Sequence, residues 1–187
     1  MKIVLAITGA SGSIYADDLI QKLLLYPKHI KEIAIVMSNN ADFVWKHELG
    51  TELPQNNIIK YYQNNDFTAP FASGSSQYDA MLIVPASMGV IGRIANTCSE
   101  NLITRAADVM LKERNTLIVC PRETPFHLLH LQNMEKITLA GGIIVPAIPS
   151  FYSKAQTIKE LIATVTDRII SLLKLPQDSY QWGISKE

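Results

Sequence analysis

The sequence has little cysteine, no excess of charge and no long apolar run. Its two cysteines, Cys98 and Cys120, lack CxxC or metal-site spacing, which indicates reduced thiols. The 17 basic and 17 acidic residues cancel, so no long-range field attracts nucleic acid or an anionic membrane, and any anion site must be local. No apolar run approaches the roughly 20 residues that a bilayer span needs. These absences predict a cytoplasmic protein that binds neither nucleic acid nor membrane.

Several catalytic signatures are also missing. The four histidines have no carboxylate or cysteine cluster that would complete a metal set. There is no GxSxG elbow, and neither cysteine has a histidine in a recognisable nucleophile motif. The sequence therefore predicts no metal site and argues against a metalloenzyme or a serine or cysteine hydrolase.

Short apolar runs alternate with longer segments of helical period along the chain. The apolar runs occupy residues 3–8, 32–37, 80–84, 116–120 and 143–145. Because they do not alternate with polar residues, they indicate parallel strands buried on both faces and flanked by helices. We expect a three-layer α/β domain, Rossmann-like or flavodoxin-like, over residues 1–175, and a polar tail at 176–187. The polar segment 50–79 predicts a long, functional or mobile connection with one short strand at 58–62.

Three strand-to-helix junctions have residues suited to an anion, because helix N-termini gather at the carboxyl edge of such a sheet. Residues 8–13 (Thr-Gly-Ala-Ser-Gly-Ser) combine glycines with hydroxyl donors. Residues 85–90 contain Ser87, a predicted helix cap. Residues 121–125 (Pro-Arg-Glu-Thr-Pro) place two charges before a predicted threonine cap and a first-turn proline.

The first junction begins like a dinucleotide-binding loop, but Tyr15 stands at the third glycine position. The run 32–37 is also followed by Ser-Asn-Asn rather than by an acid for the ribose. Nicotinamide binding is therefore disfavoured. A tight turn that binds nothing remains an alternative.

Three cations lie on predicted helical faces. Arg105 and Lys112 are seven residues apart with Asp108 between them, which fits either a solvated ladder or an anion site. Arg168 falls at the edge of an apolar stripe, where its guanidinium either reaches water or meets an anion. The residues alone leave both alternatives open.

Seven short blocks, taken in order, resemble the UbiX-like flavin prenyltransferases. They are residues 9–12 (Gly-Ala-Ser-Gly), 72–75 (Ala-Ser-Gly-Ser), 85–87 (Pro-Ala-Ser), 104–109 (Thr-Arg-Ala-Ala-Asp-Val), 111–114 (Leu-Lys-Glu-Arg), 122–125 (Arg-Glu-Thr-Pro) and 149–152 (Pro-Ser-Phe-Tyr). The likeness extends from Lys2 to about Leu175. It implies a metal-independent transferase that alkylates reduced FMN at N5 with the dimethylallyl group of dimethylallyl phosphate, after which a bond to C6 closes a fourth ring.

The resemblance also implies a role for individual residues. FMN would contact Gly9, Ala10, Ser11, Ser38, Ser87, Met88, Gly89, Val90 and Arg122. The allylic phosphate would be held by Ser73, Arg105, Lys112, Arg122, Tyr152 and Arg168, whose cations stabilise charge as the C–O bond breaks. The catalytic residues would be Ser11 and Glu123 as a proton route to the phosphate, Glu48 near the flavin for ring closure, and Lys112. Phe67 and Trp182 would shield the allylic cation.

The resemblance further implies a homododecamer with sites at subunit contacts, so that Lys112, residues 66–76 or the tail would serve a neighbour. A UbiD-like decarboxylase would receive the prenylated FMN, either in ubiquinone biosynthesis or in the degradation of aromatic acids. One alternative is an FMN-dependent cysteine-type decarboxylase, although residues 122–125 and the lack of a Pro-x-Met-Asn segment argue against it. The other is a non-catalytic FMN-binding protein, which would have no use for converging cations.

Overall fold

The computed structural model describes residues 1–176, and its centre is a six-stranded sheet. The strands lie in the order β3-β2-β1-β4-β5-β6, and each neighbouring pair is parallel. Their bounds are β1 Lys2–Ile7, β2 Glu32–Met37, β3 Ile59–Tyr62, β4 Ala80–Ala86, β5 Thr116–Pro121 and β6 Ile143–Ile144. The expected parallel α/β fold is confirmed.

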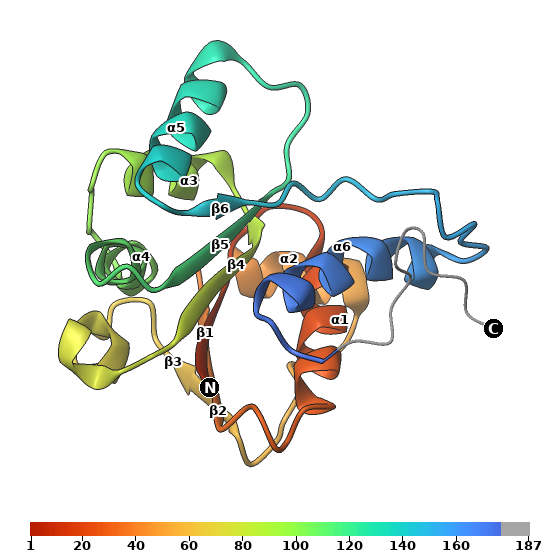
Figure 1. The fold of residues 1–187 in the computed structure, drawn as a ribbon, viewed down its shortest axis with the longest axis horizontal. Coiled ribbons are helices and arrows are strands. Elements are labelled where there is room, and N and C mark those ends of the chain that lie inside the picture. The colour runs from red at the N-terminus through yellow and green to blue at the C-terminus, as the bar shows by residue number, and fades with distance from the viewer. Residues whose placement is uncertain (177–187) are drawn as a thin grey trace.

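Six α-helices cover the two faces of the sheet (Figure 1). They are α1 Ser13–Leu24, α2 Ala41–Leu49, α3 Met88–Ala95, α4 Leu102–Lys112, α5 Leu128–Leu139 and α6 Ile158–Leu172. Helices α1, α2 and α6 lie on one face, and α3, α4 and α5 lie on the other. None of the helices in residues 1–176 is long and apolar enough to cross a membrane.

Strand β1 shows why the apolar runs do not alternate with polar residues. Ile3, Leu5 and Ile7 belong to the core shared with α1 and α6, whereas Val4 and Ala6 belong to the core shared with α3 and α4. All five side chains are fully buried. Burying a side chain of the size of Leu or Ile contributes about 1.5–3 kcal/mol, so both faces of this central strand stabilise the sheet.

Of the two predicted helix caps, one is confirmed and one is wrong. Ser87 caps α3, where its hydroxyl accepts a hydrogen bond from the Val90 amide. Asn101 and Thr104 form a capping box at the start of α4, which was not predicted. The threonine cap and first-turn proline predicted at 124–125 do not begin a helix, because α5 starts at Leu128 with His127 as its N-cap. The amide of Thr124 instead donates to the Glu123 carboxylate.

The connection 50–79 contains β3, as expected, and also two short 3₁₀ turns, η1 Pro70–Ala72 and η2 Gly74–Ser76. Phe71 of this connection is buried edge-on between Tyr62 and Tyr78, whereas Tyr61 and Phe67 are exposed. Trp182 and nearly all of the predicted tail lie outside the described residues.

Candidate functional site

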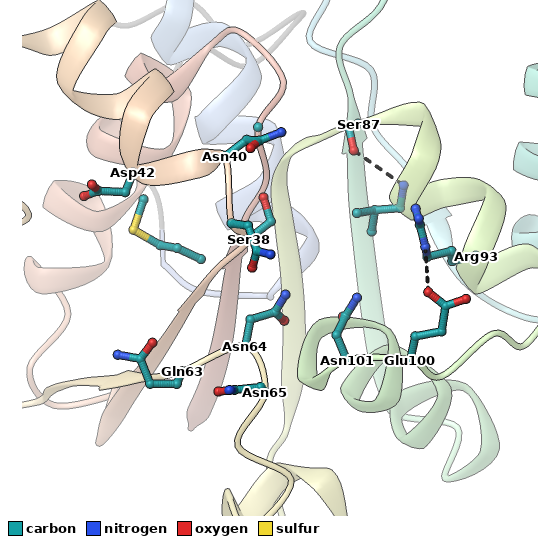
Figure 2. Close-up of a pocket in the computed structure, with 14 residues that line it drawn as sticks. Ser38, Asn40, Asp42, Gln63, Asn64, Asn65, Ser87, Arg93, Glu100 and Asn101 are labelled. Atoms are coloured by element: carbon teal, nitrogen blue, oxygen red, sulfur yellow. Dashed lines mark hydrogen bonds and ion pairs between the residues drawn. The ribbon is translucent and has the colours of Figure 1, made fainter.

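A cavity of about 770 Å³ opens at the carboxyl edge of the sheet (Figure 2). Its lining comes from the segments that follow β1, β2, β3 and β4, and from the start of α4: Gly9, Met37, Ser38, Asn39, Asn40, Asp42, Gln63, Asn64, Asn65, Ser87, Val90, Arg93, Glu100 and Asn101. Strands β1 and β4 are neighbours here, and the helices that follow them, α1 and α3, lie on opposite faces of the sheet. This reversal is the point at which open α/β sheets bind ligands.

Thr8 joins the two loops on either side of this reversal. Its buried hydroxyl donates to the Pro85 carbonyl at 2.7 Å and accepts from the Ser87 amide at 2.8 Å. The Thr8 amide also donates to the Pro85 carbonyl at 3.3 Å. These bonds fix Ser87 beside Gly9, so the cavity floor is held in place before a ligand binds.

Gly9 is required where the chain passes closest to the segment after β2. A Cβ atom at this position would lie 2.8 Å from the Cβ of Asn40, closer than side chains tolerate. The absence of a side chain therefore brings the backbone at Gly9 against the cavity wall, and it leaves that backbone exposed to a ligand.

Carboxamides supply most of the polar groups in the cavity, namely Asn39, Asn40, Gln63, Asn64, Asn65 and Asn101. The side chain of Asn64 accepts from the Ile103 amide at 3.2 Å, and that of Asn101 accepts from the Thr104 amide at 3.0 Å. Because their carbonyl oxygens are engaged, the NH₂ groups of these two residues are the donors left for a ligand.

Arg93 places a cation at the side of the cavity formed by α3. Its Nε donates to Glu100 at 3.3 Å and its Nη1 donates to the Gly89 carbonyl at 3.1 Å. Neither Arg93 nor the carboxamides were predicted as site residues from the sequence. The signal that could have found the carboxamides is their position, since residues 38–40 and 63–65 directly follow β2 and β3.

The lining fits FMN in size and chemistry. Ligand cavities usually measure about 300–1,000 Å³, and a flavin presents carbonyl and ring-nitrogen edges, hydroxyls and a phosphate, all of which hydrogen-bond to amides. Four of the predicted FMN contacts, Gly9, Ser38, Ser87 and Val90, line this one cavity. Among residues 1–176, the lining does not include Ala10, Ser11, Met88 or Gly89, which lie close in sequence to lining residues. It also does not include Arg122, which hydrogen-bonds to the Ser11 carbonyl.

Ser11, Glu48 and Arg122 meet at the first loop. The Nε of Arg122 donates to the Ser11 carbonyl at 3.0 Å. The carboxylate of Glu48 accepts from the Gly12 amide at 2.9 Å and from the Ser13 amide at 2.8 Å. Partial burial of Glu48 opposes ionisation, but hydrogen bonds from the Ser11 hydroxyl and these two amides outweigh it, so the pKa of Glu48 lies below its usual range. Glu48 is therefore an anion at neutral pH.

Cys120 and Tyr15 lie behind this loop. Burial raises the pKa of Cys120 to about 12, so this cysteine is a neutral thiol at physiological pH. Burial and the nearby Cys120 raise the pKa of Tyr15, while Arg122 acts in the opposite direction. Neither group is ready to act as a nucleophile.

Ser73, Arg105 and Lys112 form a separate group. The Nε of Arg105 donates to the Ala72 carbonyl at 3.0 Å, and its Nη1 pairs with Asp108 at 3.2 Å. Lys112 pairs with Glu113, whose carboxylate lies against Gly74. Lys112 ends α4 while Asn101, at the cavity, precedes it, so they are about 16 Å apart along the helix axis. Among the described residues of one chain, these cations do not line the cavity.

The remaining predicted residues lie on the surface. Tyr152 and Phe67 are 68% and 49% exposed, and Arg168 is an exposed residue of α6. Glu123 is also exposed, beside Arg122. A single chain thus brings four of the predicted flavin contacts into one cavity, while Arg105 and Lys112 do not line that cavity. Within residues 1–176, no group of three or more His, Cys, Asp or Glu side chains is arranged to hold a metal ion.

Comparisons with known proteins identify the family. The flavoprotein family model matches residues 1–170. The chain is 41% identical over 186 residues to the flavin prenyltransferase UbiX of Methanocaldococcus jannaschii, covering 98% of this chain and 99% of the relative. Among solved structures, AnUbiX (PadA1) in complex with FMN and dimethylallyl pyrophosphate has a TM-score of 0.85 at 36% identity, with 97% of this chain and 98% of that chain covered.

A second solved structure is described as a dodecameric FMN-dependent UbiX-like decarboxylase from Escherichia coli O157:H7. It has a TM-score of 0.89 at 30% identity and covers 97% of this chain and 99% of its own. The likeness to these relatives spans almost the whole chain, including the loops around the cavity. The chain therefore belongs to the flavoprotein family and, within it, to the UbiX-like flavin prenyltransferases.

Proposed function

We propose that the protein transfers the dimethylallyl group of dimethylallyl phosphate to reduced FMN, first at N5 and then at C6, and that prenylated FMN is its product. The observation that carries this proposal is that Gly9, Ser38, Ser87 and Val90, distant in sequence, line one cavity at the reversal point of the sheet. Support also comes from the AnUbiX relative, whose structure contains FMN and dimethylallyl pyrophosphate.

Bound FMN supplies the nucleophilic flavin ring on which both bonds form. The chain's part is to hold and orient that ring. The exposed backbone at Gly9 and the free amide groups of Asn64 and Asn101 bind its polar edges, and Val90 packs against its apolar surface. Met88 and Gly89, in the first turn of α3, direct backbone N–H groups and the positive end of the helix dipole toward the same side.

The second task is to release phosphate without a metal. In our proposal Arg122 contacts both FMN and the phosphate, and Arg105, Lys112, Tyr152, Arg168 and Ser73 complete the phosphate ligands. Cations that converge on the leaving group stabilise charge as the C–O bond breaks. Glu123 and Ser11 deliver a proton to the departing phosphate oxygen, for which a well-placed general acid contributes about 10²–10⁴-fold. Phe67 and Trp182 shield the allylic cation from water.

Because one chain keeps Arg105 and Lys112 outside its cavity, we propose that a neighbouring subunit supplies them. The surface of the chain supports association: α5 exposes Leu128, Leu129, Leu131 and Leu139, the segment leading to α6 exposes Ile148 and Phe151, and Ile158 is exposed at the start of α6. Large exposed apolar groups of this kind mark protein contacts. The Escherichia coli relative is dodecameric, and we propose the same assembly here.

We further propose that the enzyme is cytoplasmic and that a UbiD-like decarboxylase receives its product, in ubiquinone biosynthesis or in the degradation of aromatic acids. The pathway does not alter the chemistry of the site. In either pathway, prenylated FMN must be released from the cavity as a complete molecule so that another enzyme can use it.

The test is an anaerobic incubation of the protein with reduced FMN and dimethylallyl phosphate, followed by mass spectrometry of the flavin. We expect a flavin heavier by one five-carbon unit. Unchanged FMN in the presence of folded protein contradicts the proposal. A parallel incubation with oxidised FMN and a peptide ending in cysteine tests the cysteine-type decarboxylase alternative, which predicts release of CO₂.

A further inference from the structure

One peptide group, between Ser11 and Gly12, lies between a cation and an anion. Its carbonyl oxygen accepts from Nε of Arg122 at 3.0 Å. Its N–H donates to both carboxylate oxygens of Glu48, at 2.9 and 3.1 Å. Arg122 follows β5 and Glu48 belongs to α2, so two elements distant in sequence meet through a single amide.

Hydrogen bonds at the two ends of an amide strengthen each other. A guanidinium at the carbonyl oxygen draws electron density toward that oxygen and makes the N–H a better donor. A carboxylate at the N–H does the reverse and makes the oxygen a better acceptor. The Arg122 and Glu48 contacts are therefore coupled, and the loss of one weakens the other.

The local backbone is built for this arrangement. Gly12 has φ +111°, a conformation that side chains strain, and a Cβ atom there would lie 3.1 Å from the ring of Tyr15 and 3.8 Å from Cγ of Arg122. Helix α1 begins at the next residue, Ser13, whose amide also donates to Glu48 at 2.8 Å. The positive end of the α1 dipole favours a carboxylate at this place.

The link runs through the peptide and not through a salt bridge. Among the ion pairs formed within residues 1–176, none joins Glu48 to Arg122 directly. A change at Glu48 therefore reaches the guanidinium mainly by moving or depolarising the Ser11–Gly12 amide.

We infer that Glu48 is a positioning residue for Arg122 and acts through the Ser11–Gly12 peptide group. This inference rests on the proposed function, in which Arg122 contacts FMN. Removing the Glu48 carboxylate frees the Gly12 amide, weakens the hold of the Ser11 carbonyl on the guanidinium, and lowers FMN affinity in the same way as a change at Arg122. The two losses overlap, so they are not additive.

The test is a double-mutant cycle with Glu48→Gln, Glu48→Ala and Arg122→Met. Two quantities are measured for each variant: the free energy of unfolding in denaturant without ligand, and the dissociation constant for FMN from flavin fluorescence. We expect Glu48→Ala and Arg122→Met each to weaken FMN binding. The double variant should bind FMN about tenfold more tightly than the sum of the two single losses predicts. This factor corresponds to a coupling free energy of about 1.4 kcal/mol. The ligand-free unfolding cycle should show coupling of the same sign.

Glutamine is the control that separates a peptide link from attraction through space. It lacks the charge but keeps an oxygen that accepts from the Gly12 amide, so Glu48→Gln should retain part of the coupling that Glu48→Ala loses. Attraction through space predicts equal losses in both variants. Glu52→Gln removes an exposed carboxylate just beyond α2 and should be additive with Arg122→Met.

Additive effects in the ligand-free cycle, or equal losses for Glu48→Gln and Glu48→Ala, overturn the inference. A normal dissociation constant for FMN in Glu48→Ala also overturns it, whatever the effect on ring closure, which the resemblance assigns to the same carboxylate. If the wild-type protein does not bind FMN, the proposed function fails, and the ligand-free cycle still decides whether Glu48 and Arg122 are coupled.

Discussion

The hydroxyl of Thr8 accepts a hydrogen bond from the Ser87 amide, with 2.8 Å between Oγ1 and the amide nitrogen. One buried side chain therefore joins the loops after β1 and β4. The same hydroxyl donates to the Pro85 carbonyl. Through these two bonds a residue outside the cavity lining sets the spacing between Gly9 and Ser87, which are in it.

Thr8→Val should therefore lower both stability and flavin affinity. Valine has nearly the same shape but leaves the partly buried Ser87 amide without its partner, which costs about 1–3 kcal/mol, and the Pro85 carbonyl keeps only the Thr8 amide. Unfolding in denaturant measures the first effect and an FMN titration the second. Thr8→Ser keeps the hydroxyl and is the control. A Thr8→Val protein that matches the wild type in both measurements would contradict the role of Thr8.

Gly9→Ala should weaken FMN binding more than it weakens the fold. The new Cβ would meet Asn40 at 2.8 Å, and both residues line the cavity. The matched control is Gly92→Ala in α3, where the nearest atom is 3.5 Å away and alanine favours a helix by up to about 1 kcal/mol. Flavin titrations of both variants compare the two sites. Equal flavin affinity in Gly9→Ala and Gly92→Ala would argue against close approach of the ligand at Gly9.

Acid should remove the stabilisation that Glu48 provides. Because the pKa of Glu48 is lower in the folded than in the unfolded protein, its contribution is fully present above the unfolded value of about 4.3 and is lost as pH falls through the lower, folded value. The groups that face this carboxylate are the Ser11 hydroxyl and the Gly12 and Ser13 amides.

Free energies of unfolding of the wild type and Glu48→Gln, measured from neutral pH down into the acid range, test this expectation. The difference between the two proteins should be largest at neutral pH and should shrink as the carboxyl becomes protonated. A difference that is constant over this range would mean that the charge of Glu48 does not stabilise the fold.

Arg122→Ala and Glu123→Gln should separate binding from turnover. Arg122→Ala should release FMN during purification, because it removes the predicted cation beside the flavin. Glu123→Gln should retain FMN yet slow phosphate release by about 10²–10⁴-fold, since a general acid is lost. Bound flavin is read from its absorbance and phosphate release from a stopped time course. Equal retention and equal turnover in both variants would refute these two roles.

The sheet could be predicted from the sequence because strands such as β1 are buried on both faces. Such strands appear as continuous apolar runs, which are visible in the local sequence alone. The start of α5 was predicted wrongly, because the Thr-Pro pair at 124–125 reads as a cap and first turn but lies in the bend before His127 and Leu128, where the helix begins. The carboxamides of the cavity were overlooked because, in sequence, asparagines after β2 and β3 resemble ordinary loop residues. Their role depends on which strands are neighbours, and strand order is a tertiary property.

The phosphate ligands show a different limit. The resemblance grouped Arg105 and Lys112 with Arg122, but within one chain Arg105 binds the Ala72 carbonyl and Lys112 ends α4 away from the cavity. No pattern in a single sequence says which subunit completes a site. The composite site is therefore a proposal about the assembly, and it has a direct test.

That test is subunit complementation between Lys112→Ala and Arg122→Ala. Each variant alone should be inactive in prenyl transfer. If each site takes Arg122 from one chain and Lys112 from its neighbour, random co-assembly in equal amounts should restore about one quarter of the wild-type sites, because the symmetric contacts are equivalent. If both residues act within the same chain, every site of the mixture lacks one of them and no activity is restored. A mixed assembly that forms no prenylated flavin would therefore contradict the composite site.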